Sequence, residues 1–350
     1  METPMSRKLL TLSLTATLMG GTASADAPRV AVDIAPVHSL VTRVMEGVGT
    51  PDLIIQAGAS PHEYSLRPSE AAALQDANLV FWIGSGLTPW LTDTIETLAP
   101  NANVTELLEA DGTIELEFRE GALFEAHDDH KEDDDDHADE AHDDHEEESH
   151  DDHDDEKADH DDHSDDDHDD EEAGHDEHEH GDHDPHAWLS PKNAMTWLNV
   201  IAGQLSSADP DNAGTYFANA AAGRTEIELL IGEVTATLDR VRGTRFIVFH
   251  DAYQYFEMDF NFQASGAISL SDASDPSPAR ITEIRDRIAK QGIDCVLAEP
   301  QFNPDLIATV LDGTDAQTGI LDPLGSDLEP GSSLYHELIR NMSTALASCM

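Results

Sequence analysis

The segment NAGTYFANAAAGRTEIELLIGEVTATLDRVR, residues 212–242, decides how the rest of the chain is organised. It contains no proline, and its apolar residues recur at the spacing of three to four residues that is typical of a helix. A helix of about 30 residues is about 45 Å long, which is unusual inside a globular domain. We therefore expect one long helix that connects two lobes of the chain.

Short apolar segments alternate with helical patterns on both sides of this helix. Strand-like segments lie at residues 28–34, 51–56 and 78–84 before it, and at 245–250, 262–270, 293–300 and 318–325 after it. Helical patterns lie between and beside them, at 38–47, 67–77, 88–99, 190–210, 251–260, 277–292, 304–317 and 335–347. Strands that alternate with helices pair in parallel through right-handed crossovers. The predicted fold class is therefore α/β, with a parallel sheet in each of two lobes.

The first 25 residues have the composition of an export signal. Arg7 and Lys8 precede an apolar stretch at residues 9–19, and small residues follow it at Ala23 and Ala25. This order of charged, apolar and small residues is that of a secretory signal peptide and predicts cleavage after Ala25. A membrane anchor is the alternative, but the apolar stretch is too short to span a bilayer. We expect a soluble mature protein in an exported compartment.

The chain is strongly acidic, with 18 Lys and Arg residues against 73 Asp and Glu residues and a formal net charge of −55. Such a charge repels nucleic acid, because a protein that binds phosphates must neutralise them with cations. No apolar segment reaches the ~20 residues that a membrane-spanning helix needs. The composition therefore excludes nucleic-acid-binding and membrane-spanning classes.

Residues 125–184 carry most of the excess charge, with 35 acidic residues, two lysines and 14 histidines. This insert has no aromatic and almost no aliphatic residue, so it cannot bury enough apolar surface to fold, and we expect it to be disordered. The motif HDDH recurs at 127–130, 142–145, 150–153 and 160–163. Imidazole and carboxylate are ligands of borderline divalent cations. The pattern favours a collector with many weak metal sites over a merely solvated acidic tract.

Three histidines outside the insert lie at the ends of predicted elements. His62 lies in the loop after the strand-like segment 51–56, His186 lies where the chain leaves the insert, and His250 ends the strand-like segment 245–250. Open α/β sheets bind their ligands at the carboxyl ends of the strands. We therefore expect the three imidazoles to converge on one metal ion.

Five segments, three of which contain these histidines, carry a resemblance to a known family. They are GASPHEYSLRPSE at 58–70, DPHAWLSP at 184–191, VFHDAYQYFE at 248–257, AEPQF at 298–302 and GILDPLG at 319–325. In this order they resemble the signature segments of the zinc-binding proteins of bacterial ABC importers, the ZnuA type. The resemblance covers nearly the whole chain after the export signal. It implies two Rossmann-like lobes joined by a long rigid helix, with a metal site in the cleft between them. It also implies a periplasmic protein that captures Zn²⁺ with high affinity and delivers it to an inner-membrane ABC permease with a cytoplasmic ATPase.

The resemblance assigns the metal ligands to His62, His186 and His250, with Asp322 in the fourth position. Some relatives carry an acidic ligand immediately before the first histidine, where this chain has Pro61. Asp322, a water and a histidine of the insert therefore remain candidates for the fourth ligand, in that order. Manganese importers of the same family use a carboxylate at the position of His250. Three imidazoles and one oxygen suit tetrahedral Zn²⁺ better than the harder Mn²⁺.

Cys295 and Cys349 are the two cysteines of the chain. Two lone cysteines in an exported protein pair more often than they stay free, and the resemblance implies the same disulfide in the second lobe. Of the remaining histidines, His38 opens the first predicted helix and is a candidate for the edge of the cleft. His336 lies on the last predicted helix, where we expect it at the surface.

The expected organisation is a signal peptide at 1–25, a first lobe at 26–124 and 185–210, the insert at 125–184, a connecting helix at 211–243 and a second lobe at 244–350. We expect a monomer that is not an enzyme. Two other functions remain open. One is a stand-alone periplasmic zinc buffer or chaperone, in which the insert is the working part. The other is a hydrolase with a three-histidine zinc site, although no general base other than Glu63 lies beside the predicted ligands in the sequence.

Overall fold

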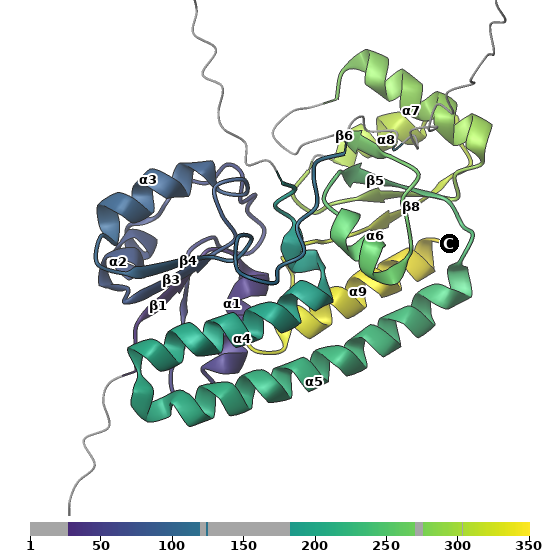
Figure 1. Cartoon of the computed structure of the whole chain (residues 1–350). Coiled ribbons are helices and arrows are strands. Elements are labelled where there is room, and N and C mark those ends of the chain that lie inside the picture. The colour runs from purple at the N-terminus through teal and green to yellow at the C-terminus, as the bar shows by residue number, and fades with distance from the viewer. Residues whose placement is uncertain (1–26, 120–123, 125–182, 270–275, 303) are drawn as a thin grey trace, which may run out of the picture. The chain divides into compact units, whose positions relative to one another are not determined.

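The computed structural model of the chain describes residues 27–119, 124, 183–269, 276–302 and 304–350. The predicted export signal at 1–25 and the predicted insert up to residue 182 lie outside the described residues. Two α/β lobes and the helices that link them make up the described part (Figure 1). No helix in these ranges is both long and apolar enough to span a bilayer.

The first lobe is built on a parallel sheet with the strand order β2-β1-β3-β4. Its strands are β1 (Val30–Val32), β2 (Asp52–Leu53), β3 (Leu79–Trp82) and β4 (Asn103–Glu106). Its helices are α1 (Ala35–Val44), α2 (Pro68–Asp76), α3 (Pro89–Leu98) and α4 (Pro191–Ala208). The central strands β1 and β3 are fully buried, so their continuous apolar sequences predict them. The edge strand β4 is half-exposed and reads NVTE, so no apolar segment predicts it.

The second lobe repeats this topology, with the strand order β6-β5-β7-β8. Its strands are β5 (Phe246–His250), β6 (Ala267–Ser269), β7 (Cys295–Ala298) and β8 (Gln317–Ile320), all paired in parallel. Its helices are α6 (Gln254–Phe260), α7 (Pro278–Gln291) and α8 (Pro304–Leu311). The predicted fold class is confirmed. In such sheets ligands bind at the carboxyl ends of the strands where the order reverses, which in this lobe is between β5 and β7.

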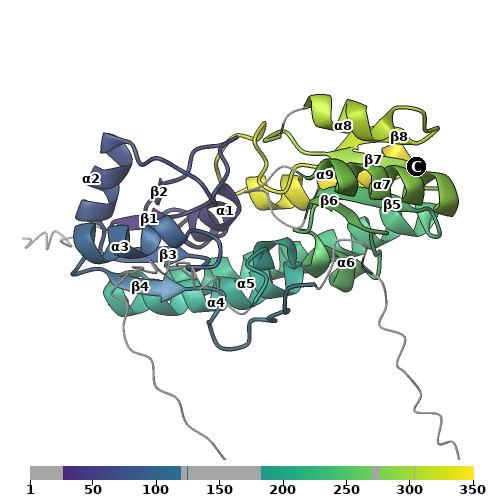
Figure 2. The same ribbon diagram turned by 90° about the horizontal axis from the view of Figure 1, so that it is seen from above.

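The predicted connecting helix is α5 (Ala213–Leu238), which has 26 residues and is about 39 Å long at 1.5 Å per residue. Short 3₁₀ turns at Pro210–Asn212 and Asp239–Val241 precede and follow it. It packs along α1 and α4 of the first lobe and ends at the second lobe, as Figures 1 and 2 show. A β-carbon at Gly223 would lie 3.1 Å from Leu198 of α4, so the glycine permits the close approach of these two helices.

The last helix, α9 (Leu334–Cys349), makes a second connection between the lobes. At its start, the Tyr335 amide donates to the hydroxyl of Ser39 on α1 at 3.0 Å. At its end, Cys349 forms the predicted disulfide with Cys295 of β7, with the two α-carbons 5.8 Å apart. The helix is therefore tied non-covalently to the first lobe and covalently to the second.

Residues 114–119 and 183–186 form a structure that we call the stem. Its two segments meet in an antiparallel bridge between Glu117 and His183, and the Asp184 amide donates to the Leu116 carbonyl at 2.8 Å. Helix α6 holds both segments, because the Tyr255 hydroxyl accepts from the Leu116 amide at 3.0 Å and donates to the Asp184 carbonyl at 2.8 Å. The stem thus includes His183 and Asp184, the last two residues of the predicted insert.

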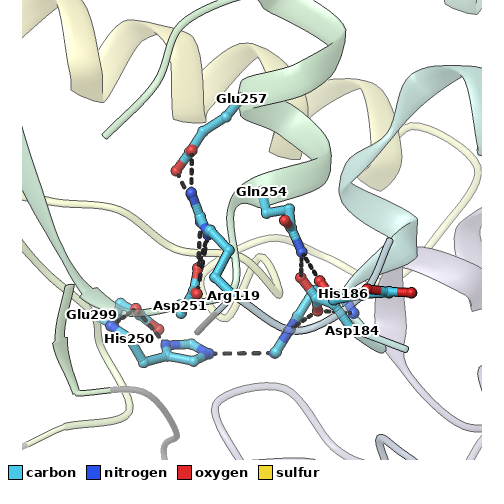
Figure 3. A network of polar contacts seen from close by, with 9 residues as sticks. Arg119, Asp184, His186, His250, Asp251, Gln254, Glu257 and Glu299 are labelled. Atoms are coloured by element: carbon cyan, nitrogen blue, oxygen red, sulfur yellow. Dashed lines mark hydrogen bonds and ion pairs between the residues drawn. The ribbon is translucent and has the colours of Figure 1, made fainter. Parts of the chain in front are cut away.

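Arg119 ends the first segment of the stem and binds two buried carboxylates of the second lobe (Figure 3). Its guanidinium donates to both oxygens of Asp251, which directly follows β5, and to Glu257 of α6 at 2.8 Å. The Phe124 ring covers the guanidinium at 3.6 Å. Burial raises the pKa of both carboxyl groups, and the charge of Arg119 opposes that rise. The charge of Arg119 therefore offsets part of the cost of burying two carboxylates beside the end of β5.

Replacing both cysteines by alanine should lower the free energy of unfolding without changing the fold. The bridge closes a loop between residues 54 positions apart, and removing a native disulfide of this kind costs about 2–5 kcal/mol. Urea unfolding of the Cys295→Ala/Cys349→Ala variant measures the loss, and unfolding the native protein under reducing conditions is the control. An unfolding midpoint equal to that of the oxidised protein would contradict the expectation.

Arg119→Ala should lower the free energy of unfolding by about 3–5 kcal/mol at neutral pH, because it leaves buried carboxylates unpaired. Since burial raises the pKa of Asp251 and Glu257, the folded variant takes up protons more readily than the unfolded chain. Part of the loss should therefore be recovered between about pH 7 and about pH 5. Urea unfolding at several pH values measures both effects.

The matched control is Arg340→Ala, which removes a half-exposed ion pair with Glu233 and should cost less than about 1 kcal/mol. If the two variants lose the same stability, or if the loss in Arg119→Ala does not depend on pH, the contacts of Arg119 with Asp251 and Glu257 have no special role in folding.

Candidate metal centre

The three histidines predicted as ligands come from three separate parts of the chain and face one cavity. His62 lies in the loop between β2 and α2, His186 precedes the short 3₁₀ turn η1 (Ala187–Leu189), and His250 is the last residue of β5. The ring centroid of His186 lies 5.6 Å from that of His62 and 5.2 Å from that of His250. The cavity is lined by Ser60, Pro61, His62, His186, Trp188, His250, Glu299, Gln301, Phe302, Pro323 and Leu324.

The closest pair in the cavity is formed by the two buried histidines. The Nε2 atoms of His186 and His250 lie 3.4 Å apart, as the dashed line in Figure 3 marks. Two nitrogens bound at 2.0–2.1 Å to one tetrahedral zinc ion are also about 3.3–3.4 Å apart. The pair therefore has the spacing of two ligands that share one ion.

A buried carboxylate holds the other nitrogen of each ring. The Nδ1 atom of His186 lies 2.7 Å from Asp184 Oδ1, and that of His250 lies 2.7 Å from Glu299 Oε1. A carboxylate in this position keeps the proton on Nδ1, so the Nε2 lone pair points into the cavity. Both rings are thus held in the tautomer and the orientation that metal ligands need.

The sequence analysis does not predict Asp184 or Glu299 as site residues, although the position of each one in the sequence could have identified it. Asp184 precedes His186 by two residues, and its own Oδ1 also accepts from the His186 amide at 3.0 Å. Glu299 follows β7 directly, at the point where the strand order of the second sheet reverses. A carboxylate at that point lies beside the end of β5, where His250 stands.

Tyr253 stands behind His250 and is also absent from the predicted site. It is fully buried, and burial together with the nearby Glu299 charge raises the pKa of its hydroxyl. The group therefore stays protonated and acts as a hydrogen-bond donor. Its ring centroid lies 6.2 Å from that of His250.

His62 lines the same cavity, and its side chain is more exposed than those of the other two histidines. Its loop is fixed from the first lobe, because the Trp90 indole donates to the Pro61 carbonyl at 2.9 Å. The His62 side chain itself is only half-buried. Within the described residues, no three His, Cys, Asp or Glu side chains already stand at the mutual distances of a full ligand set. The three rings therefore line one cavity without already forming a complete ligand set.

Asp322, the predicted fourth ligand, is not among the residues that line the cavity. Its carboxylate accepts four hydrogen bonds from its own loop, from the amides of Leu324 and Gly325 and from the amide and hydroxyl of Ser326. An ionised carboxylate has about four lone-pair sites, so these bonds use its full capacity. The cavity wall is formed instead by the next two residues, Pro323 and Leu324.

The two remaining histidines outside the predicted insert are not among the residues that line the cavity. His38 is buried in the first lobe, where its Nε2 lies 3.1 Å from the Pro51 carbonyl, and burial lowers its pKa. His336 is half-buried rather than at the surface, so that expectation is wrong. Its Nε2 is enclosed by neighbouring side chains, and burial lowers its pKa as well. Neither residue lines the site.

Comparison with known proteins agrees with this architecture. The family model described as "Zinc-uptake complex component A periplasmic" matches residues 30–349. The High-affinity zinc uptake system protein ZnuA of Brucella abortus (strain 2308) is 46% identical over 331 residues, which cover 95% of this chain and 94% of that protein. The protein of the same name from Paracoccus denitrificans (strain Pd 1222) is 47% identical over 329 residues, which cover 94% of this chain and 93% of that protein.

Solved structures show the same fold at lower sequence identity. A crystal structure of ZnuA superimposes with a TM-score of 0.67 at 21% identity and covers 93% of this chain and 99% of that one. A mutant structure of the laminin-binding adhesin Lmb from Streptococcus agalactiae also gives a TM-score of 0.67, at 22% identity, and covers 92% of this chain and 99% of that one. The resemblance drawn from the sequence is confirmed. With a family match over nearly its whole length and close relatives at almost half identity, the chain belongs to the ZnuA family of periplasmic components of zinc-uptake complexes.

Proposed function

We propose that this protein captures Zn²⁺ in the periplasm and delivers it to an ABC-type permease for zinc uptake. Its family membership supports the transport role, since the curated relatives are named as zinc uptake proteins. The observation that carries the proposal is the pair of Nε2 atoms of His186 and His250, 3.4 Å apart. They belong to separate segments, and each ring is oriented by its own buried carboxylate.

The chemistry of the cavity suits zinc as the cargo. Neutral imidazole is a preferred ligand of borderline cations such as Zn²⁺, whereas harder ions favour carboxylate and carbonyl oxygens. Asp184 and Glu299 place two carboxylates behind the rings, with side-chain exposures of 2% and 1%. A divalent cation bound between the rings compensates these charges in a buried setting, where electrostatic attraction is stronger than in water. We assign the ligands as His62, His186 and His250.

Capture and release then involve small movements of the lobes. His62 belongs to the first lobe and His250 to the second, so a bound ion joins the two lobes directly. Helices α5 and α9 both connect the lobes, and the stem adds a third connection through α6. Links of this kind restrict wide hinge opening and favour modest shifts. The permease would recognise the loaded protein by such a shift.

Proteins of this family are solute-binding transport proteins rather than enzymes. The hydrolase alternative also lacks support in the site, because Glu63, its candidate general base, is exposed and is not among the residues that line the cavity. We further infer that the protein acts as a monomer, that residues 1–25 direct its export, and that a cytoplasmic ATPase drives the partner permease.

Substituting one histidine of the buried pair should abolish tight binding. In His250→Ala the ion loses one of three imidazoles, and we expect zinc affinity to fall at least about 100-fold, the upper end of what removing only a supporting group costs. Competition titration against a strong zinc chelator measures the zinc affinity of the tight site without interference from weak sites. The control is His336→Ala, which removes a histidine that does not line the cavity. Equal affinity in His250→Ala and the native protein would exclude this site.

Deleting residues 125–179 separates a transport component from a stand-alone buffer. The deletion leaves the stem intact, since the described part of the stem begins again at residue 183. We expect the shortened protein to keep one tight zinc site, because none of the assigned ligands is removed. Equilibrium dialysis with zinc counts the bound ions before and after the deletion. Loss of the tight site together with most of the capacity would support the buffer instead.

A further inference from the structure

Among the side chains that line the cavity, Gln301 is the one whose polar atoms make no hydrogen bond to the described part of the protein. It lines the same cavity as the three histidines. Both atoms of its carboxamide, Oε1 and Nε2, are buried, and neither has a hydrogen-bond partner among the described residues. Burying an amide without partners is unfavourable, so a group of this kind calls for a ligand that satisfies it.

The turn that carries Gln301 is fixed on both sides. It begins at Glu299, which binds the His250 ring, and the Phe302 amide donates to the Glu299 carbonyl at 3.2 Å. The Phe302 ring stacks on Phe249 of β5, with ring centroids 4.1 Å apart. The same ring lies 5.7 Å from His250. The backbone of Gln301 is therefore held beside a predicted metal ligand.

Three imidazoles leave one position of a tetrahedral zinc ion to be filled. Pro61 has no coordinating side chain, and the Asp322 carboxylate is fully used by its own loop. A water molecule bound to zinc needs an acceptor for its protons, which the metal makes more acidic. A neutral glutamine offers that acceptor through Oε1 and adds no charge to the site.

We propose that the fourth ligand of the captured zinc ion is a water molecule and that the Gln301 carboxamide holds it by a hydrogen bond. The inference rests on the proposed function and makes Gln301 a positioning residue that acts on the ion through the water. A water ligand exchanges without breaking a bond between protein and metal. The site thus keeps one exchangeable position, at which an incoming ligand of the permease can begin to bind the ion.

The test compares two substitutions at Gln301 in the full-length protein. Gln301→Leu keeps the approximate size of the side chain and removes both polar atoms. Gln301→Glu keeps an acceptor oxygen at the same place. Gln263→Leu, at an exposed position in the same lobe, is the matched control. Zinc affinity is measured by chelator competition, and the visible absorption spectrum of the protein loaded with less than one equivalent of Co²⁺ reports the ligands of the tight site.

We expect Gln301→Leu to lower zinc affinity about 10-fold, as loss of a supporting hydrogen bond does at other metal sites, and to change the Co²⁺ spectrum. Gln301→Glu should restore the affinity, and Gln263→Leu should change neither measurement. Urea unfolding of Gln301→Leu checks that the variant is folded, and the Gln301→Glu result tests the proposal if it is not.

The proposal is overturned if Gln301→Leu matches the native protein in affinity and spectrum. It is also overturned if Asp322→Asn weakens binding and alters the spectrum more than Gln301→Leu does, since the carboxylate would then be the fourth ligand. Failure of the proposed function looks different, because His250→Ala would then bind zinc as tightly as the native protein.

Discussion

The proposed zinc site depends on two imidazole nitrogens, those of His186 and His250, that lie 3.4 Å apart in one cavity. Two lone pairs at this distance repel one another unless a cation lies between them. Asp184 and Glu299 prevent the rings from turning away, because each binds the Nδ1 atom of its histidine at 2.7 Å. The free energy of binding an ion is therefore not reduced by a cost of orienting the rings. The fold supplies this orientation in advance, which is the usual basis of tight metal binding.

The two rings stay close together only if the two lobes keep their relative positions. The helix α5 packs on the first lobe and leads into the second, and α9 returns to α1 from a disulfide on β7. Arg119 adds a polar link from the stem to Asp251, the residue after His250 (Figure 3). Each link enters the second lobe close to β5 or β7, the two strands whose ends carry His250 and Glu299. The links between the lobes are therefore concentrated beside the proposed metal site.

Much of this arrangement follows from sequence patterns, and the exceptions have physical reasons. Fully buried strands such as β3 and the long helix α5 carry continuous or periodic apolar signals, so they are predicted within a few residues. The exposed edge strand β4 carries none. His250 stands out because it ends a strand, and His62 and His186 because they lie in loops beside predicted elements. The absence of Asp322 from the cavity wall depends instead on how one short loop folds back on its own carboxylate. Contacts such as Arg119 with Glu257 join residues 138 positions apart, and no local pattern encodes them.

The antiparallel bridge between Glu117 and His183 has a consequence for how the family can vary. The chain leaves and re-enters the first lobe at neighbouring points, and α6 fixes both points through Tyr255. Closing a loop costs only about 0.6 kcal/mol more for each doubling of its length. Residues can therefore be gained or lost between these two points at little cost to folding. The histidine-rich tract is free to change in length and composition over evolution while the cavity beside it keeps its shape.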